Sequence, residues 1–244
     1  MRRITCLLND MVALVTFRDL GLMPYNTALQ IQKQCFDALI AQKMHFRTHP
    51  EEYLRKVLHH LLFVEHPHVY TLGKSAKTAN LLVREDFLRS INASSTTTDR
   101  GGDITYHGPG QLVGYPVWDL EFLGLGIKSY ISGLEESIIQ MLSGYGISAG
   151  RMEGASGVWI DAGVPGKERK ICAVGVRVSH GVSMHGFALN INTDLAYFQY
   201  INPCGFQDKG VTSMKHELGR EVDAEEVKVL VLSNLQKIFE IQWH

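Results

Sequence analysis

The stretch that constrains the backbone most is Arg100-Gly101-Gly102-Asp103-Ile104-Thr105-Tyr106-His107-Gly108-Pro109-Gly110-Gln111, which holds four glycines and one proline. Glycine permits positive φ and a close approach of the main chain to a bound group, and Pro109 has no N–H to donate to a β-ladder. We therefore expect a shaped loop here, and neither a helix nor a central strand. Its main-chain N–H groups, Arg100 and His107 are candidate substrate contacts, and a tight β-turn with an incidental histidine is the alternative.

Outside this loop, the composition is that of an ordinary folded chain. The 244 residues are enough to bury a substantial core, and no repeat or linker-like stretch divides them. We expect one mixed α/β domain over residues 1–244, in which a C-terminal helix at about residues 220–244 could form a small appended element. The formal net charge of -1 argues against a nucleic-acid-binding surface.

The N-terminal segment does not have the pattern of a signal peptide. Asn9 and Asp10 interrupt the apolar residues after Met1 before a signal-length run develops. No run approaches the roughly 20 apolar residues that a membrane helix needs. We therefore expect a cytoplasmic protein that does not engage a membrane.

Hydrophobic periodicity predicts a few long helices and several short strands along the chain. Pro116 suggests an edge or a bend in its strand, and Asp223 with Glu226 has the spacing of a capping box. The segment from Lys43 to His60 is charged and weakly periodic, so we expect a peripheral excursion with some helix at 51–58. The helices are expected at 25–43, 127–145 and 223–240, and the strands at 11–19, 61–64, 69–72, 94–98, 112–120, 157–161, 170–179 and 184–192, the last three as an antiparallel meander.

The four cysteines form no CxxC pair, which fits free thiols in a reducing compartment. Cys35 lies on the apolar stripe of its helix, where packing is the expected role. Cys204 differs, because it lies between Pro203 and Gly205 just after a short helical segment at 194–201. A thiol presented from a constrained loop is a candidate nucleophile, and an inert thiol is the alternative.

A cysteine nucleophile needs a partner that takes its proton. His107, His185 and His216 are available, and so is Lys170. Lys170 enters a largely apolar strand, where loss of hydration lowers the pKa of a lysine, whereas Lys167 and Arg169 are expected to be solvated in the preceding turn. The composition leaves histidine and lysine equally open.

Four histidines, His59, His60, His66 and His68, suggest zinc at first sight. Adjacent histidines point in different directions on a regular element, and no cysteine is near enough in sequence to complete a site. We predict no metal site.

Several motifs, taken together in their order, closely resemble the lipoyl(octanoyl) transferase family. The similarity runs from about Leu61 to Met214, and its four main motifs carry the argument. Besides Arg100 to Gln111, the matching motifs are Lys170-Ile171-Cys172-Ala173-Val174-Gly175-Val176-Arg177, Met184-His185-Gly186-Phe187-Ala188-Leu189-Asn190, Asn202-Pro203-Cys204-Gly205, Glu65-His66-Pro67-His68-Val69-Tyr70-Thr71-Leu72-Gly73 and Gly210-Val211-Thr212-Ser213-Met214.

This resemblance implies a fold shared with lipoate-protein ligases and the catalytic domain of biotin-protein ligases, a single mixed sheet with flanking helices. It implies transfer of an octanoyl group from acyl carrier protein to a lysine of a lipoyl domain, in 2-oxoacid dehydrogenase complexes and in the glycine cleavage H protein. Cys204 would be the acyl-thioester nucleophile and Lys170 the general acid/base, with no ATP or other cofactor. The substrate-binding residues implied are Arg100, Gly101, Gly102, Asp103, Ile104, Thr105, Tyr106, His107, Ala173, Val174, Gly175, Gly186, Phe187 and Ala188.

The residue types agree with this chemistry. Small residues in these segments would open a slot for an apolar acyl tail, and Lys74, Lys77 and Arg84 are candidate contacts for an acidic carrier protein or simply solvated charges. The chain departs from the family pattern at Lys43 to His60 and at 163–169, which look longer than the family minimum. Two alternatives stay open: an ATP-dependent lipoate or biotin ligase, and a carrier-protein-binding protein without catalysis.

Overall fold

The computed structural model describes residues 12–49, 57–202 and 209–244. These residues form a mixed α/β fold built on a nine-stranded sheet in the order β12-β1-β2-β6-β10-β9-β8-β7, with β11 also pairing with β9. The strands are β1 (Ala13–Leu22), β2 (His59–Glu65), β6 (Gln111–Val117), β7 (Ala149–Met152), β8 (Ala155–Ile160), β9 (Arg169–Ser179), β10 (Val182–Asn190), β11 (Gly210–Val211) and β12 (Ile241–Trp243).

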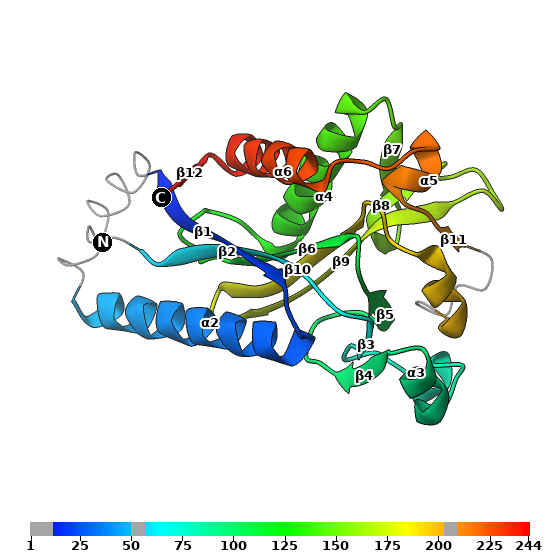
Figure 1. The fold of residues 1–244 in the computed structure, drawn as a ribbon. Coiled ribbons are helices and arrows are strands. Elements are labelled where there is room, and N and C mark those ends of the chain that lie inside the picture. Colours follow the sequence, from blue (N-terminus) through cyan, green and yellow to red (C-terminus); the bar gives the residue numbers. More distant parts are fainter. Residues whose placement is uncertain (1–11, 50–56, 203–208) are drawn as a thin grey trace.

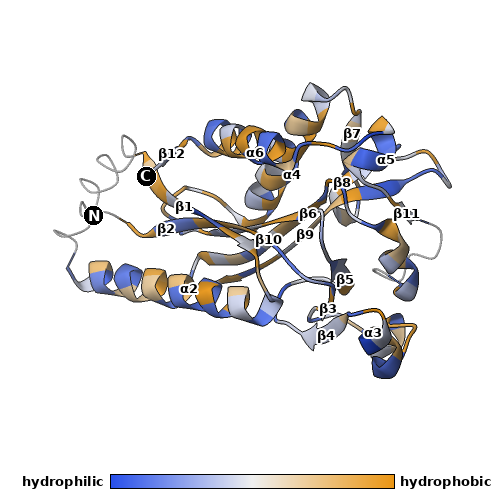
Figure 2. Ribbon diagram, viewed as in Figure 1, coloured by the Kyte–Doolittle hydropathy of each residue, from blue (hydrophilic) through white to orange (hydrophobic). Residues whose placement is uncertain are grey.

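Helices cover both faces of this sheet (Figure 1). Helix α2 (Tyr25–Thr48) lies against one face, and α4 (Ile127–Gly144) and α6 (Ala224–Phe239) pack together on the other. The main core lies between α4, α6 and the sheet, where Leu134, Ile138, Val231 and Leu235 are buried. Figure 2 shows mainly apolar central strands, while the helices carry both apolar and polar residues. This layering confirms the predicted fold class.

A second sheet of three strands packs beside the large one, in the order β4-β3-β5. It consists of β3 (Val69–Leu72), β4 (Ser94–Thr97) and β5 (Ile104–His107). Shorter helices complete the chain: η2 (Thr78–Asn80), α3 (Glu85–Ser90), η3 (Leu195–Tyr200) and α5 (Met214–Leu218).

Several predicted elements are confirmed. Strands β8, β9 and β10 form the expected antiparallel meander. Asp223 is the N-cap of α6, and its side chain accepts from the backbone N–H groups of Glu225 and Glu226. Cys35 is buried on α2, as its place on the apolar stripe predicted. The last strand was not predicted: β12 pairs in parallel with β1 at the edge of the sheet.

The prediction of a loop throughout Arg100 to Gln111 was wrong for the middle of that stretch. Residues Ile104–His107 form β5, which pairs antiparallel with β3. Ile104 and Tyr106 are buried on one side of that strand, so the gain from burying them outweighs the loop tendency of the flanking glycines. Only Arg100 to Asp103 and the turn at Gly108 to Gly110 remain irregular.

Two further predictions need correction. Of the two alternatives given for Pro116, the edge strand is wrong, because β6 lies between β2 and β10; the pairing with β10 ends at Gly114, before the proline. The Lys43 end of the expected excursion is not peripheral either. Helix α2 continues to Thr48 because Lys43 and Phe46 are both buried against the fold. The helix expected at 51–58 falls largely outside the described residues.

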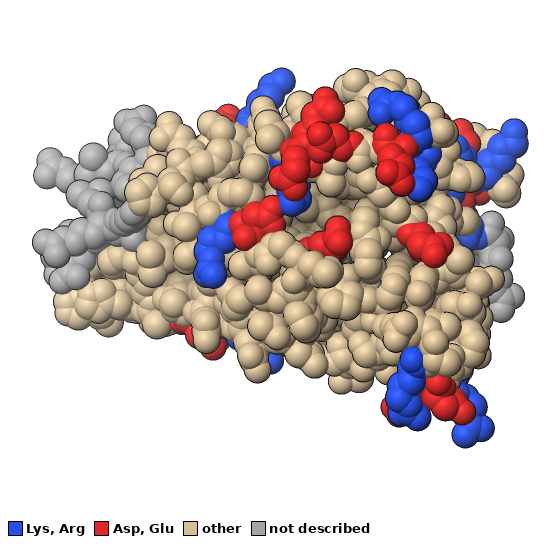
Figure 3. All heavy atoms as spheres, in the orientation of Figure 1, with Lys and Arg blue, Asp and Glu red and all other residues tan. Residues whose placement is uncertain are grey.

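Among the described residues, no helix combines the length and apolar character needed to cross a membrane. Side chains of both charges are interspersed on the face shown in Figure 3.

Candidate active site

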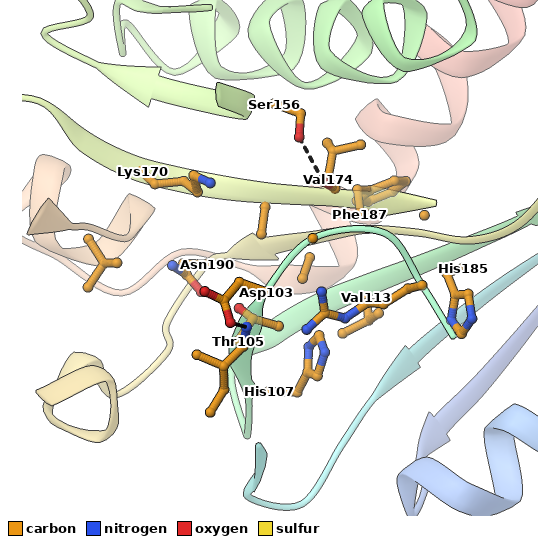
Figure 4. A pocket seen from close by; sticks show the side chains of 18 of the residues that line it. Asp103, Thr105, His107, Val113, Ser156, Lys170, Val174, His185, Phe187 and Asn190 are labelled. Carbon is orange, nitrogen blue, oxygen red and sulfur yellow. Dashed lines mark hydrogen bonds between the residues drawn. The ribbon is translucent and has the colours of Figure 1, made fainter. Parts of the chain in front are cut away.

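One cavity of about 350 Å³ opens between the first part of the glycine loop and the strands β6, β9 and β10. Figure 4 shows Lys170 and Asn190 near one end of this cavity and His185 near the other. Between the two ends, Phe187 and Val113 contribute apolar surface, and the strands also contribute the small residues Ala173, Gly175, Gly186 and Ala188. A long, mostly apolar slot with polar groups at its ends suits a chain-like acyl group.

The glycine loop lies directly on β9. The N–H of Gly101 donates to the carbonyl of Val176 at 2.9 Å, and a Cβ at Gly175 would lie only 3.0 Å from the carbonyl oxygen of Gly101. A larger residue at position 175 would push the loop off the strand. Close approach of two backbones is therefore the reason for glycine here.

Arg100 and His107 are held by protein groups in the wall of the cavity. Nη2 of Arg100 donates to the carbonyl of Thr71 at 2.6 Å, and Nδ1 of His107 lies 2.8 Å from Oε1 of Gln111. Burial holds the pKa of His107 well below its usual value, so this ring is neutral. Both residues line the cavity, but their hydrogen bonds show that they also fix the shape of the loop.

Lys170 is the second residue of β9, where it pairs with Trp159 on β8 and with Val211 on β11. Its Nζ lies 4.6 Å from the centroid of the Trp159 ring, a distance at which the ring stabilises a positive charge. Both side chains line the cavity.

The adjacent Arg169 is only partly exposed and is ion-paired, whereas it was expected to be solvated. It forms a bidentate ion pair with Glu217, with both N···O distances at 2.7 Å, and a further one with Asp161. The hydrogen bond from Arg169 holds the pKa of Glu217 below its usual value.

The three predicted substrate segments meet in this cavity. All of their residues line it except Tyr106, which is buried in the smaller core with its hydroxyl 2.7 Å from Nδ1 of His68. Of the other candidate bases, His185 lines the cavity and lies 2.8 Å from Asp99, and burial lowers its pKa to about 4. His216 is exposed on α5 and does not line the cavity.

Cys204 lies outside the described residues. The two cysteines that the structure does describe, Cys35 and Cys172, are buried and are not part of the cavity lining. Burial raises the pKa of both thiols, most strongly for Cys172. Neither is suited to act as a nucleophile in the cavity.

The sequence did not reveal several lining residues, among them Tyr25, Tyr115, Trp159 and Asn190. Asn190 ended a matched motif, but nothing distinguished it from a surface residue. Trp159 could have been found from the predicted meander, because antiparallel pairing places a residue of the preceding strand beside Lys170. Tyr25 and Tyr115 reach the cavity through tertiary packing that no local pattern encodes.

The chain is similar to curated relatives over most of its length. The octanoyltransferase of Bacteroides fragilis strain YCH46 is 54% identical over 210 residues, covering 86% of this chain and 91% of the relative. That of Parabacteroides distasonis is 51% identical over 223 residues, covering 91% and 97%.

Solved structures share the fold. A bipartite lipoate protein ligase of Thermoplasma acidophilum aligns with a TM-score of 0.66 at 18% identity, covering 96% of this chain and 86% of its own. A lipoate-protein ligase A solved with ATP aligns with a TM-score of 0.65 at 17% identity, covering 96% and 88%.

A family model described as the lipoyl protein ligase A/B catalytic domain matches residues 24–236. That match covers most of the chain, and the resemblance inferred from the motifs is confirmed. The chain belongs to the lipoyl protein ligase A/B catalytic domain family and is a transferase.

Proposed function

We propose that this protein moves an octanoyl group from acyl carrier protein to a lysine of a lipoyl domain, through a thioester on Cys204 and with Lys170 as general acid/base. The observation that carries the proposal is the cavity, a slot of mostly apolar and small residues with a lysine at one end. Relatives named octanoyltransferase, about half identical over nearly their whole length, support the acyl group and the reaction type.

In the first half-reaction, the Cys204 sulfur attacks the carbonyl carbon of the carrier thioester. Lys170, as a neutral amine, takes the thiol proton, and the Trp159 ring stabilises the ammonium that forms. The C–S bond to the carrier then breaks, and the departing carrier thiolate takes the proton from Lys170. One thioester replaces another, so no ATP is consumed.

In the second half-reaction, the acceptor lysine attacks the Cys204 thioester. Lys170 takes a proton from the attacking amine and delivers it to the departing Cys204 sulfur. An amide replaces a thioester, which makes this half-reaction downhill. The apolar slot keeps the octanoyl tail in place between the two steps.

Exposed basic residues are candidate contacts for the acyl carrier protein. Lys74 and Lys77 are exposed beside the glycine loop, since the N–H of Lys74 donates to the carbonyl of Arg100 at 3.0 Å. Arg84 lies on the α3 corner, where Figure 3 shows both signs of charge, and its guanidinium is 3.9 Å from Asp86. Lys74 and Lys77 are thus the better candidates for an acidic partner.

The test is incubation with octanoylated carrier protein without ATP, followed by intact mass. We expect one octanoyl adduct in the wild type and none in Cys204→Ser. Cys35→Ser is the matched control, because Cys35 is buried on α2 away from the cavity, and it should acquire the adduct. An adduct retained in Cys204→Ser, or a requirement for ATP, would contradict the mechanism, and the ATP requirement would favour a ligase.

A further inference from the structure

On one of its sides, strand β9 changes its pairing partner beside Lys170. Strand β10 pairs with β9 as far as Leu189 opposite Cys172, and there its pairing with β9 ends. Beyond that point β11 takes its place, with Gly210 opposite Arg169 and Val211 opposite Lys170 in parallel register. On the side away from β8, the backbone around Lys170 therefore pairs only with a two-residue strand, which other groups must hold in place.

Asn190, the last residue of β10, is the side chain at this junction. It is 4% exposed, it lines the cavity, and its Nδ2 donates to the carbonyl of Thr212 at 2.9 Å. Thr212 directly follows β11, and its N–H donates to the carbonyl of Lys170 at 3.0 Å. Through one residue, the Asn190 amide is thus tied to the main chain of Lys170.

The amide oxygen of Asn190 connects this junction to the glycine loop through Gln111. Oδ1 of Asn190 accepts from Nε2 of Gln111 at 2.9 Å, and the same Nε2 donates to the carbonyl of Tyr106 at 3.2 Å. Both N–H donors of Gln111 are then used, and its Oε1 can only accept a hydrogen bond. Nδ1 of His107, 2.8 Å from this Oε1, must therefore be the donor. A neutral His107 with its proton on Nδ1 has an acceptor at Nε2.

The remaining bonds follow the same direction. The Thr71 hydroxyl lies 3.3 Å from Nε2 of His107, to which it can donate, and it accepts from Nε of Arg100 at 3.2 Å. Arg100, Thr71, His107, Gln111 and Asn190 thus each donate to the next residue, and the last bond ends on the carbonyl of Thr212. We call this buried chain of hydrogen bonds the relay. Such a chain is fully satisfied in only one set of tautomers and amide orientations, which makes its geometry stiff.

We propose that Asn190 is a positioning residue, the link through which this relay sets β11 and the main chain of Lys170 relative to the glycine loop. The inference rests on the proposed function, in which Lys170 must reach the reacting sulfur while the glycine loop holds the acyl chain. Asn190 acts through Lys170 and takes no proton itself. A small misplacement of a proton-transfer group slows the reaction without weakening substrate binding.

The closing experiment measures the rate of octanoyl adduct formation over a range of carrier concentrations. Asn190→Leu, which removes both amide contacts, should lower the saturating rate by about tenfold or more and leave the half-saturating concentration within about twofold. Asn190→Asp keeps an acceptor for Gln111 but places a carboxylate against the Thr212 carbonyl, and it should be equally slow. A wild-type rate in Asn190→Asp would overturn the link to Thr212.

Asn192 offers a matched control on the same segment. Its side chain makes two hydrogen bonds with the backbone of Val222, at 2.8 and 3.0 Å, and it is not part of the cavity lining. Asn192→Leu should lower the thermal unfolding midpoint and keep the wild-type saturating rate. Equal slowing in both variants would show a general loss of structure and overturn the positioning role.

A second readout does not depend on activity. Nitrogen NMR of the wild-type histidines should show the His107 proton on Nδ1, and a proton on Nε2 would overturn the direction of the relay. Wild-type protein that forms no adduct would overturn the proposed function itself. Wild-type transfer together with an unimpaired Asn190→Leu variant would overturn the positioning role alone.

Discussion

Two lysines of the fold, Lys43 on α2 and Lys170 on β9, have different surroundings. Near the C-terminal end of α2, Lys43 is 7% exposed, and its Nζ lies 2.7 Å from Asp119 and 2.9 Å from Glu121. At the start of β9, Lys170 lies over the face of Trp159 and lines the cavity. The first lysine faces two carboxylates, whereas the second faces an aromatic ring and the acyl slot.

This difference shows that burial alone does not mark a catalytic lysine. Lys43 is held by two carboxylates and is not part of the cavity lining. Lys170 instead lines the cavity beside the Trp159 ring, whose face stabilises a positive charge. We therefore propose a structural role for the Lys43 region and a chemical role for the Lys170 region.

The largest effect that tests this division is expected from Lys170→Ala. Removal of a positioned general acid/base should slow formation of the octanoyl adduct by about 10²–10⁴-fold. The measurement is the adduct rate at saturating carrier by quenched-flow mass spectrometry, with circular dichroism to confirm folding. A folded variant with the wild-type rate would point to a histidine base, and His107 and His185 both line the cavity.

A smaller effect, on stability instead of rate, is expected from Lys43→Met. Loss of the ammonium leaves the buried Asp119 carboxylate without its buried counter-ion, which typically costs about 3–5 kcal/mol of unfolding free energy. Glu121→Gln is the matched control: its side chain is 61% exposed, so its loss should cost less than about 1 kcal/mol. Urea unfolding at neutral pH measures both.

The adduct rate of folded Lys43→Met should equal that of the wild type, since Lys43 is not part of the cavity lining. A large loss of rate without loss of stability would reverse the two roles. Equal destabilisation by Lys43→Met and Glu121→Gln would show that burial of Asp119 is not the cause.

The sequence predicted one of these two regions better than the other. Lys170 was identified because it begins an apolar strand and belongs to a matched motif, and the predicted meander placed that strand correctly. Lys43 was assigned to a peripheral segment because the local pattern becomes charged there. The ion pair to Asp119, 76 positions away, is a tertiary contact that no window of sequence contains.

The cavity, too, was predictable only where the signal is local in the sequence. The glycine loop and the small residues of β9 and β10 were predictable, since glycine and alanine at close backbone approaches are a local signal. The relay through Gln111 and Asn190 was not, because amides carry no sequence pattern that tells a buried link from a solvated side chain. Its members meet only when β6, β10 and the segment after β11 are brought together.

The smallest expected effect is the pH dependence contributed by His59, which lies beside the Lys43 cluster. Its Nδ1 accepts from the N–H of Asp119 at 3.2 Å, and burial, then His60 and Lys43, lower its pKa to about 4. An unfolded histidine has a pKa of about 6.5, so the unfolded state takes up the proton first as the pH falls. The stability that neutral His59 contributes is therefore fully present above about pH 6.5 and is lost progressively down to about pH 4.

His59→Asn isolates this contribution, because the amide oxygen can accept from the same N–H without titrating. Between about pH 7 and about pH 5.5, the unfolding free energy of the variant should fall by about 1.2 kcal/mol less than that of the wild type. Urea unfolding at the two pH values measures the difference. An identical fall in both proteins would mean that His59 is protonated in the fold, and the Lys43 region would then tolerate a second buried cation beside Asp119.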